Sequence, residues 1–425
     1  MKTPTLQRFW RFLTVPRGRV ASRFYKARAS RKSEGGVALL MVITTLMFMT
    51  VLVADLNYGA RVRLMMAAHQ RDEAQAYWLA RTGTNLYALI LAANMELAKN
   101  DMLSSSSAMF GVNLGDALWQ MVPAINTGLL RMLFAFGGSV DDEELEEFAE
   151  EGVSDEVREI SMEGGGRFDD KNFLDFDGDF SASIVDEDSK VSIAALGQGT
   201  TEQGGDWRDD PAAQQLFGLM SGEENDQWFY DRNIDRWEVI GHLKDWTDAD
   251  TMVSSGQGSF EDNFYNRLDS PYMAKNAPFD SKEEIRLVEG WQDDVYERFR
   301  DQLTIYGNGR VNINTASDEV IKGLIRAYIQ AMNNPGMDER MEMVIADMRD
   351  QMLLTSFQKP KDFVQWVEGQ GLGEMKSGLK KAVKTKSEVF TIVSIGQVGE
   401  TTVTVTTIMD FQSSSFGETV YWRVD

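Results

Sequence analysis

The hydrophobic and polar positions first indicate one long helix. An uncharged apolar run extends from Val37 to Ala54, and at about 1.5 Å per helical residue it would span roughly 27 Å, close to the hydrocarbon thickness of a bilayer. Apolar residues continue at helical spacing as far as Leu89. We therefore predict a helix over residues 37–99 whose first part crosses a membrane and whose second part is amphipathic.

Apolar and polar residues alternate in two stretches that lie far apart in the chain. The first covers residues 184–193, with an acidic turn at 186–188, and predicts a half-buried hairpin strand. The second covers residues 389–425 and predicts three strands, with turns at 396–400 and 413–417. Together they predict a sheet that is built from both sides of the intervening chain.

The chain between these stretches has helical spacing instead. The patterns at 283–303 and 318–333 are the clearest, and Thr315 or Ser317 is the expected N-cap of the second. We predict an α+β fold: a long N-terminal transmembrane helix, an antiparallel sheet, and a large α-helical domain of SAM or helix-hairpin-helix type inserted into the sheet domain. The expected parts are a basic leader (1–36), the long helix (37–99), the first part of the α+β domain with a long connection (100–207), the inserted helical domain (208–386) and the C-terminal strands (387–425).

The charge distribution predicts how the chain is oriented across the membrane. Residues 1–36 hold ten basic side chains and one acid, a net charge of +9, which leaves −32 for the rest of a chain whose total is −23. The positive-inside rule then places the N-terminus in the cytoplasm and the acidic body outside it. A body of this charge also argues against binding to nucleic acid.

Candidate chemistry is limited by composition. The absence of Cys excludes thiol catalysis and thiolate metal sites, and neither His69 nor His242 belongs to a recognisable catalytic motif. We expect His69 to be a packed or interfacial residue of the long helix, and His242 to lie in a strand or turn near the acidic loop. Paired carboxylates for glycoside cleavage depend on spatial separation and stay open at this point.

Oxygen ligands for calcium are the remaining candidate, and they are concentrated in one acidic loop that also holds Gly256 and Gly258. Its spacing is not that of an EF-hand, so composition alone favours an ordinary acidic loop. A rival is the alternation of Asp175, Asp177 and Asp179, which has Phe180 where an EF-hand needs glycine. The carboxylates of the main candidate are Asp245, Asp248, Asp250, Glu261 and Asp262.

The beginning of the chain resembles the type IV pilin and pseudopilin class. A basic leader, Gly35-Gly36 and then a long apolar helix form the arrangement that a prepilin peptidase cuts after glycine, and the expected cut lies between Gly36 and Val37. A plain uncleaved anchor is the alternative. The fifth mature residue would be Met41, where most members of the class carry a glutamate. A subunit without this carboxylate need not sit beneath another subunit.

The middle of the chain resembles the general secretion pathway protein K family, the large minor pseudopilins of type II secretion. Three stretches carry the resemblance, at 181–196, 242–290 and 309–324. Two places depart from it: Ser192 and Ala194 replace a usual pair of asparagines, and the connection over 101–166 is longer. The matching residues are Asp245-Trp246, Asp248, Asp250, Glu261-Asp262, Tyr265, Pro271-Tyr272, Asn276, Pro278-Phe279 and Asn312-x-Asn314-Thr315-Ala316.

The resemblance implies an assembly protein and not an enzyme. It implies a single-pass protein of the bacterial inner membrane with a periplasmic body, cut and N-methylated at its N-terminus, at the tip of the pseudopilus. Its partners would be other minor pseudopilins, the major pseudopilin and the prepilin peptidase. The resemblance also implies calcium in the helical domain, with Asp248, Asp250, Glu261 and Asp262 as the expected ligands.

Two alternatives remain from the sequence. A minor pilin of a type IV pilus would share the anchor, and a membrane-anchored periplasmic hydrolase would share the topology. The stretch from Asn312 also resembles a helix-hairpin-helix module, which often binds DNA backbone. We interpret it as a small helical packing unit, because such modules use basic residues and this body is strongly acidic.

Overall fold

The computed structural model describes residues 35–99, 119–120, 122, 124–135, 167–168, 171–172, 177–196, 206–254, 260–330 and 336–425. Most of the expected leader and of the 101–166 connection, and the acidic run at 141–151, lie outside these residues. The chain divides into two compact units, residues 1–70 and 71–425.

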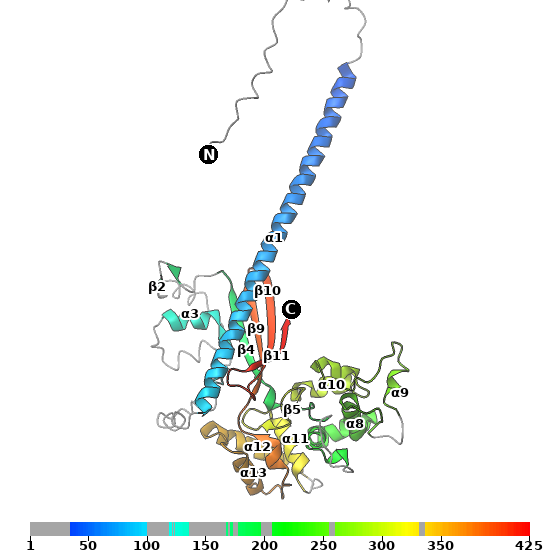
Figure 1. Cartoon of the computed structure of the whole chain (residues 1–425), viewed down its shortest axis with the longest axis vertical. Coiled ribbons are helices and arrows are strands. Elements are labelled where there is room, and N and C mark those ends of the chain that lie inside the picture. Colours follow the sequence, from blue (N-terminus) through cyan, green and yellow to red (C-terminus); the bar gives the residue numbers. More distant parts are fainter. Residues whose placement is uncertain are drawn as a thin grey trace, which may run out of the picture. The chain divides into compact units, whose positions relative to one another are not determined.

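The first unit contains the N-terminal part of helix α1 (Gly35–Lys99) (Figure 1). Its most apolar stretch has a mean hydropathy of 2.6 and none of it is buried, and by length and composition it can cross a membrane. The hydroxyls of Thr44, Thr45 and Thr50 donate to main-chain carbonyls of the preceding turn, at 2.9, 2.7 and 2.9 Å. These polar groups are therefore satisfied within the helix, as an apolar environment requires. The predicted long helix is confirmed.

The second unit contains a five-stranded antiparallel sheet in the order β1-β4-β9-β10-β11 (Figure 1). Its central pair joins distant parts of the chain, since Ile184 of β4 lies opposite Ile392 of β9. The helical segments lie between these two strands in sequence, so the predicted insertion into an α+β fold is confirmed. The strands are β1 (Ala124–Asn126), β4 (Asp179–Asp186), β9 (Val389–Val398), β10 (Thr401–Asp410) and β11 (Glu418–Val424).

The C-terminal part of α1 packs on one face of this sheet. Tyr87 and Leu91 of α1 are fully buried beside Phe390 and Ile392 of β9 in one hydrophobic cluster. Gly396 of β9 makes the closest approach: a Cβ at this position would overlap the carbonyl oxygen of Ala76 and lie 2.7 Å from the Ala80 nitrogen. Main chain therefore lies directly against main chain at this point.

Gly396→Ala should consequently lower the free energy of unfolding by roughly 2 kcal/mol, because the added methyl group forces the helix away from the sheet. Chemical denaturation of the purified protein measures the loss. Gly369→Ala is the matched control, since a Cβ at Gly369 meets nothing within 4 Å. Equal stability of the two variants would contradict the packing described.

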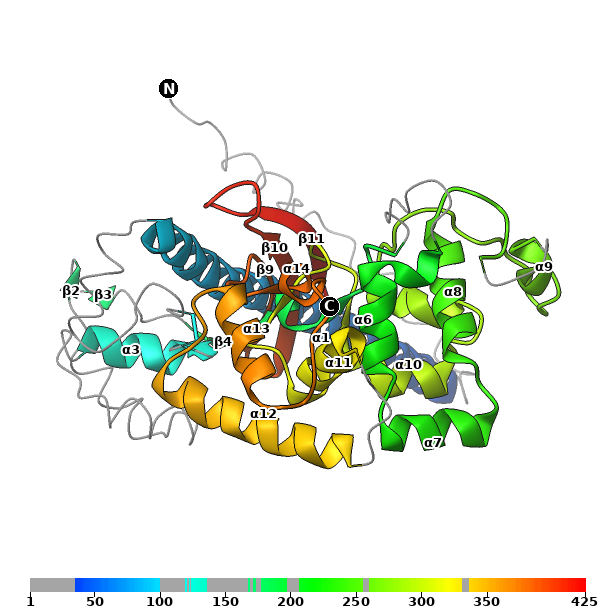
Figure 2. The same ribbon diagram turned by 90° about the horizontal axis from the view of Figure 1, so that it is seen from below.

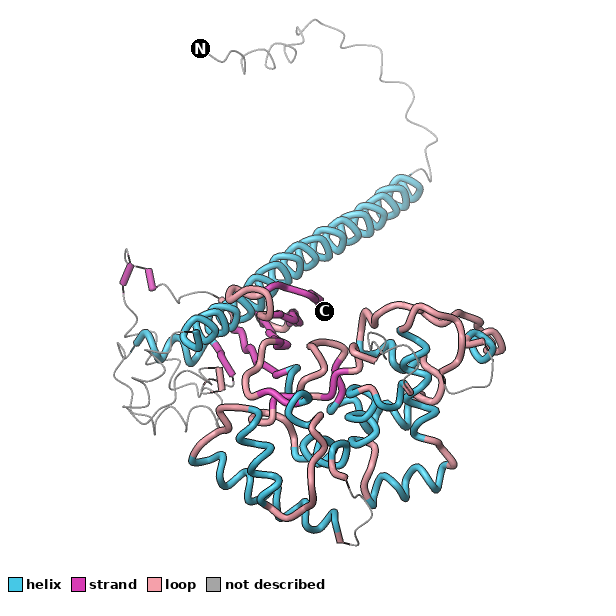
Figure 3. Tube along the Cα trace, turned by 60° about the horizontal axis from the view of Figure 1, so that its bottom comes forward, coloured by secondary structure: helices cyan, strands magenta, loops and turns pink. Residues whose placement is uncertain are grey.

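The inserted segment forms a second, larger core made mainly of helices (Figures 2 and 3). Helices α6 and α11 are its most closely packed pair. The longer helices are α6 (Pro211–Leu219), α7 (Glu223–Arg232), α8 (Arg236–Thr247), α10 (Asp293–Phe299), α11 (Asp318–Tyr328), α12 (Met337–Leu354) and α13 (Pro360–Gly369). Short elements complete it: α9 (Asp262–Tyr265), α14 (Leu379–Ala382), β5 (Val191–Ser192), β6 (Leu303–Thr304), β7 (Val311–Asn312) and β8 (Val383–Lys384). Outside this core lie α3 (Thr127–Ala135), β2 (Arg167–Phe168) and β3 (Lys171–Asn172).

The expected hairpin at 184–193 is wrong. After β4 the chain makes a 3-10 turn (Glu187–Ser189), capped by the Asp186 side chain, which accepts from the Asp188 nitrogen. The next strand, β5, leaves the sheet and pairs in parallel with β6. The capped turn thus redirects the chain into the helical core instead of returning it along β4.

The observed helix boundaries also differ from those that the sequence patterns predicted. The stretch 283–303 is a 3-10 segment (Lys282–Leu287), then α10 and a second 3-10 turn, because Gly290 with φ +80° interrupts it. Helix α11 ends at Tyr328, and the next residue, Ile329, makes a β-bridge with Met375. Its cap is Ser317, whose hydroxyl accepts from the Val320 nitrogen at 3.4 Å.

Candidate metal site

The acidic loop connects the end of α8 to α9 and folds back on itself. Asp235 caps the start of α8, and the helix ends at Thr247, just before Asp248. An antiparallel bridge between Met252 and Phe260 closes the loop and brings its two ends together. Gly256 and Gly258, which were expected to orient carbonyl ligands, lie outside the described residues.

Three of the five expected carboxylates meet in this loop. One oxygen from each of Asp248, Asp250 and Glu261 lies within 4.8 Å of the others. Asp245 instead accepts from the Ser254 nitrogen with both oxygens, at 2.9 and 3.1 Å. Asp262 accepts from the Ala274 nitrogen at 2.9 Å. These last two carboxylates hold the main chain in place around the cluster.

Glu261 is the most constrained of the three. Glu261 is only 6% exposed, and neither of its carboxylate oxygens has a hydrogen-bond donor among the described residues. Burial, followed by repulsion from Asp248, Asp245 and Asp250, raises the pKa of Glu261 to about 8. The ionised form therefore needs a positive charge that its surroundings do not supply.

The residues at the cluster fit a hard divalent cation. Within the described part of the loop, Asp248 Oδ1 is also buried without a donor, so the cluster offers three acceptor atoms that no protein group satisfies. Lys244 contacts the other oxygen of Asp248 and donates to Ser254 Oγ at 3.0 Å, and so neutralises only part of the charge. Calcium and magnesium take carboxylate and carbonyl oxygens of this kind. An acidic loop without an ion would leave these acceptors unpaired.

The rival acidic stretch has a different environment. Asp175 lies outside the described residues. Asp179 contacts Arg131 at 3.4 Å, and the carbonyl of Asp177 accepts from Gln75 Nε2 at 2.7 Å. Among the described residues, the only set of three close ligand atoms is the one formed by Asp248, Asp250 and Glu261.

The two histidines lie on helices. His242 belongs to α8, so its expected place in a strand or turn is wrong; its Nδ1 lies 3.0 Å from the carbonyl oxygen of Glu289 and its Nε2 lies 3.8 Å from the Glu289 carboxylate. His69 is exposed on the part of α1 in the first unit. The contacts of His242 are those of a residue that joins α8 to the segment before α10.

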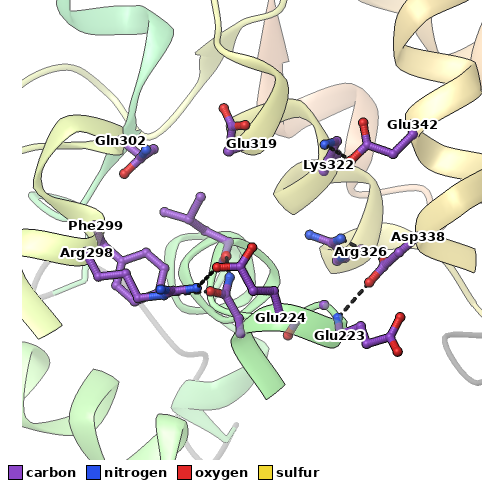
Figure 4. A pocket seen from close by; sticks show the side chains of 14 residues that line it. Glu223, Glu224, Arg298, Phe299, Gln302, Glu319, Lys322, Arg326, Asp338 and Glu342 are labelled. Carbon is purple, nitrogen blue, oxygen red and sulfur yellow. Dashed lines mark hydrogen bonds and ion pairs between the residues drawn. The ribbon is translucent and has the colours of Figure 1, made fainter. Parts of the chain in front are cut away.

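A concave site that sequence reasoning missed lies among α7, α10, α11 and α12 (Figure 4). It encloses about 680 Å³. Its three basic side chains are all bound to acids of the chain itself, in the pairs Arg298–Glu224 at 2.7 Å, Arg326–Asp338 at 2.7 Å, and Lys322–Glu342. Figure 4 shows Asp338 between Arg326 and the main chain of Glu223, whose nitrogen donates to it at 2.6 Å. No local motif could have indicated this cleft, because its residues come from several elements that are separate in the sequence.

Comparisons with known proteins agree with the resemblance found in the sequence. Residues 193–308, which include the cluster of Asp248, Asp250 and Glu261, match the family model of type II secretion system (T2SS) protein K. The curated type II secretion system protein K of Aeromonas hydrophila is 27% identical over 173 residues, which are 39% of this chain and 47% of that protein. The chain thus matches about half the length of this relative.

Among solved structures, a similar chain occurs in the crystal structure of the GspK-GspI-GspJ complex from the enterotoxigenic Escherichia coli type 2 secretion system. The TM-score is 0.43 and the sequence identity is 17%, with 76% of this chain and 98% of that chain covered. The expected resemblance to the protein K family is confirmed over the residues that the family model matches.

Proposed function

We propose that this chain, whose residues 193–308 belong to the type II secretion system protein K family, is a minor pseudopilin that initiates or caps the pseudopilus used for protein export across the outer membrane. The observation that carries the proposal is the combination of this family segment with a long N-terminal helix whose C-terminal part packs on an antiparallel sheet. The function is assembly, and the chain is not proposed to be an enzyme.

Two features favour a position at the tip. The inserted helical core is large, and it would have to be accommodated in every repeat if the subunit occurred along a tightly packed filament. Met41 also lacks the carboxylate that would neutralise the terminal amine of a neighbouring subunit in a low-dielectric helix bundle. Both features are compatible with a subunit that has neighbours on one side only.

The proposed partners follow from the exposed apolar part of α1. Side chains such as Phe48 and Met47 are 74% and 68% exposed, and this surface must be covered by lipid or by other apolar helices. We propose the inner membrane before assembly, and the helices of other minor pseudopilins and of the major pseudopilin afterwards. The acidic body would lie in the periplasm, and no nucleic acid partner is proposed.

Deletion of the gene tests the function directly. Pseudopilus number and secretion of a type II substrate should both fall strongly, and the full chain supplied in trans should restore them. Normal secretion in the deletion strain would sink the proposal. A minor pilin of a type IV pilus, the second candidate, would alter pilus number and leave type II secretion intact, whereas an anchored hydrolase would act without either filament.

Processing of the N-terminus gives an independent prediction. Gly36 and Val37 lie in the first turn of α1, which begins at Gly35, and a prepilin peptidase acting after Gly36 would leave Val37 as the mature N-terminus. Mass spectrometry of the protein from its own host should find an N-methylated peptide that begins at Val37. Gly36→Leu should retain the leader, and an intact Met1 in the unaltered protein would contradict pilin-type processing.

We also propose that the cluster of Asp248, Asp250 and Glu261 binds calcium, with Asp245 and Asp262 as the carboxylates that orient its main chain. A bound cation would supply positive charge beside the buried Glu261 carboxylate and would tie the end of α8 to the start of α9. Because it would bind the folded state only, calcium would raise the stability of the helical core by mass action.

A further inference from the structure

Asp186 is the point at which three segments far apart in the sequence meet. It ends β4, and its Oδ2 accepts hydrogen bonds from the hydroxyl of Thr315, which precedes α11, and from that of Ser387, which precedes β9. Its Oδ1 accepts from the Asp188 nitrogen at 2.9 Å. One carboxylate therefore connects the sheet to the inserted helical core and to the segment where the chain returns from it.

The surrounding charges leave Asp186 without a cation. Lys384 contacts Asp188 at 2.5 Å and Glu388 at 3.3 Å, and Lys190 contacts Glu187 at 2.7 Å. Among the described residues, Asp186 itself forms no ion pair, although it is only 5% exposed. Burial, opposed by the two hydroxyl donors, is the main cause that raises the pKa of Asp186 to about 6, and the negative charge of Asp188 adds to the rise.

The same neighbours can also hold the protonated carboxyl group. The Thr315 hydroxyl lies 2.5 Å from Asp186 Oδ2 and 3.4 Å from the carbonyl oxygen of Asn312, so it can accept the carboxyl proton and donate to that carbonyl instead. Ser387 Oγ accepts from Asn312 Nδ2 at 2.6 Å and keeps its own proton for Asp186. Both forms thus have partners, but only the ionised form carries the desolvation cost of a buried charge.

We propose that Asp186 is a proton-sensitive latch between the sheet and the inserted helical core, which closes more tightly when the carboxyl group is protonated and opens more often when it is ionised. The direction of this pH effect follows from the linkage between proton binding and closing of the joint. In an opened joint the group would have its ordinary pKa of 3.8, whereas the closed joint raises the pKa to about 6, so the closed state binds the proton more tightly. Closing is therefore favoured as the pH falls, and the advantage is lost as the pH rises through about 6.

Amide hydrogen exchange measures this opening. The main-chain nitrogens of Glu388 and Val389 donate to Asp188 Oδ2 at 2.7 and 3.1 Å, beside the latch, and their protons exchange only when the joint opens. In the full chain, held in detergent, their protection factors, corrected for the intrinsic pH dependence of exchange, should fall about tenfold between pH 5 and pH 7.5. The pH around the folded protein would then set how often the joint between the sheet and the helical core opens.

Three variants decide whether Asp186 is responsible. Asp186→Asn cannot titrate and should show protection that does not change over this range. Asp269→Asn, at an exposed position elsewhere, should keep the tenfold change. Thr315→Val removes one donor to the ionised form, so the fall in protection should move to higher pH, which tests the proposal even if Asp186→Asn does not fold. The same pH response in Asp186→Asn as in the unaltered protein, or no change in the unaltered protein, would overturn it.

Discussion

Replacing Lys384 by methionine should lower the free energy of unfolding by about 3 to 5 kcal/mol, the usual cost of removing one partner from a buried ion pair. Lys384 is 5% exposed and Asp188 is 3% exposed, and the Lys384 Nζ lies 2.5 Å from Asp188 Oδ2. Methionine fills the space of the lysine stem but leaves the Asp188 charge buried without a cation. Denaturant unfolding at neutral pH measures the loss.

The controls separate charge from packing. Lys380→Met, at an exposed position on α14, should change stability by less than about 1 kcal/mol. Combining Lys384→Met with Asp188→Asn should restore part of the loss, because the unpaired charge is removed while the acceptor for the Glu388 and Val389 nitrogens remains. A single variant as stable as the control would show that the pair contributes nothing at this position.

Exchanging Asp248 for asparagine and Glu261 for glutamine together should abolish any stabilisation by calcium. In the unaltered protein, calcium at a hundred times its dissociation constant should add about 2.7 kcal/mol to the stability of the folded state. Thermal unfolding in calcium chloride and in EDTA gives the two values. Without calcium, the double variant should be at least as stable as the unaltered protein, because glutamine removes the buried carboxylate whose pKa is raised to about 8.

The matched control uses the two acids that the structure assigns to the main chain. Asp245→Ala with Asp262→Ala should lower stability in EDTA, since alanine removes the oxygens that accept from the Ser254 and Ala274 nitrogens, but should keep a rise in calcium. The two double variants should therefore give opposite results: the first keeps its stability in EDTA and loses the rise with calcium, whereas the second loses stability in EDTA and keeps the rise. A calcium-dependent rise that survives in Asp248→Asn with Glu261→Gln would reject the cluster as the binding site.

Local patterns predicted the elements in which apolar residues recur at a regular spacing along one segment of the sequence. Helix α1 and strands β9 to β11 have such patterns, and they were found where expected. The destination of β5 could not be predicted in this way, because its partner, β6, lies more than a hundred residues further along the chain. The wrong hairpin follows from this: alternation shows that a strand is half buried, but not which strand it pairs with.

The candidate site shows the same limit at the level of single residues. Acidic composition identified the loop and all five carboxylates, yet the sequence could not separate those that face a common point from those that hold the main chain. Asp186 was recognised only as part of an acidic turn. Its partners, Thr315 and Ser387, are 129 and 201 residues away, and only the fold brings them together.

The register between β4 and β9 has a consequence for how this architecture can change. Asp186, the last residue of β4, lies directly opposite Phe390, near the start of β9, so the chain leaves the sheet and returns to it on neighbouring strands about 5 Å apart. Any domain whose two ends lie that close together could occupy this position without altering strand order. The position between β4 and β9 can therefore accept domain insertions, so the inserted domain can be enlarged or exchanged during evolution. A fluorescent protein could also be inserted there without changing the fold of α1 and the sheet.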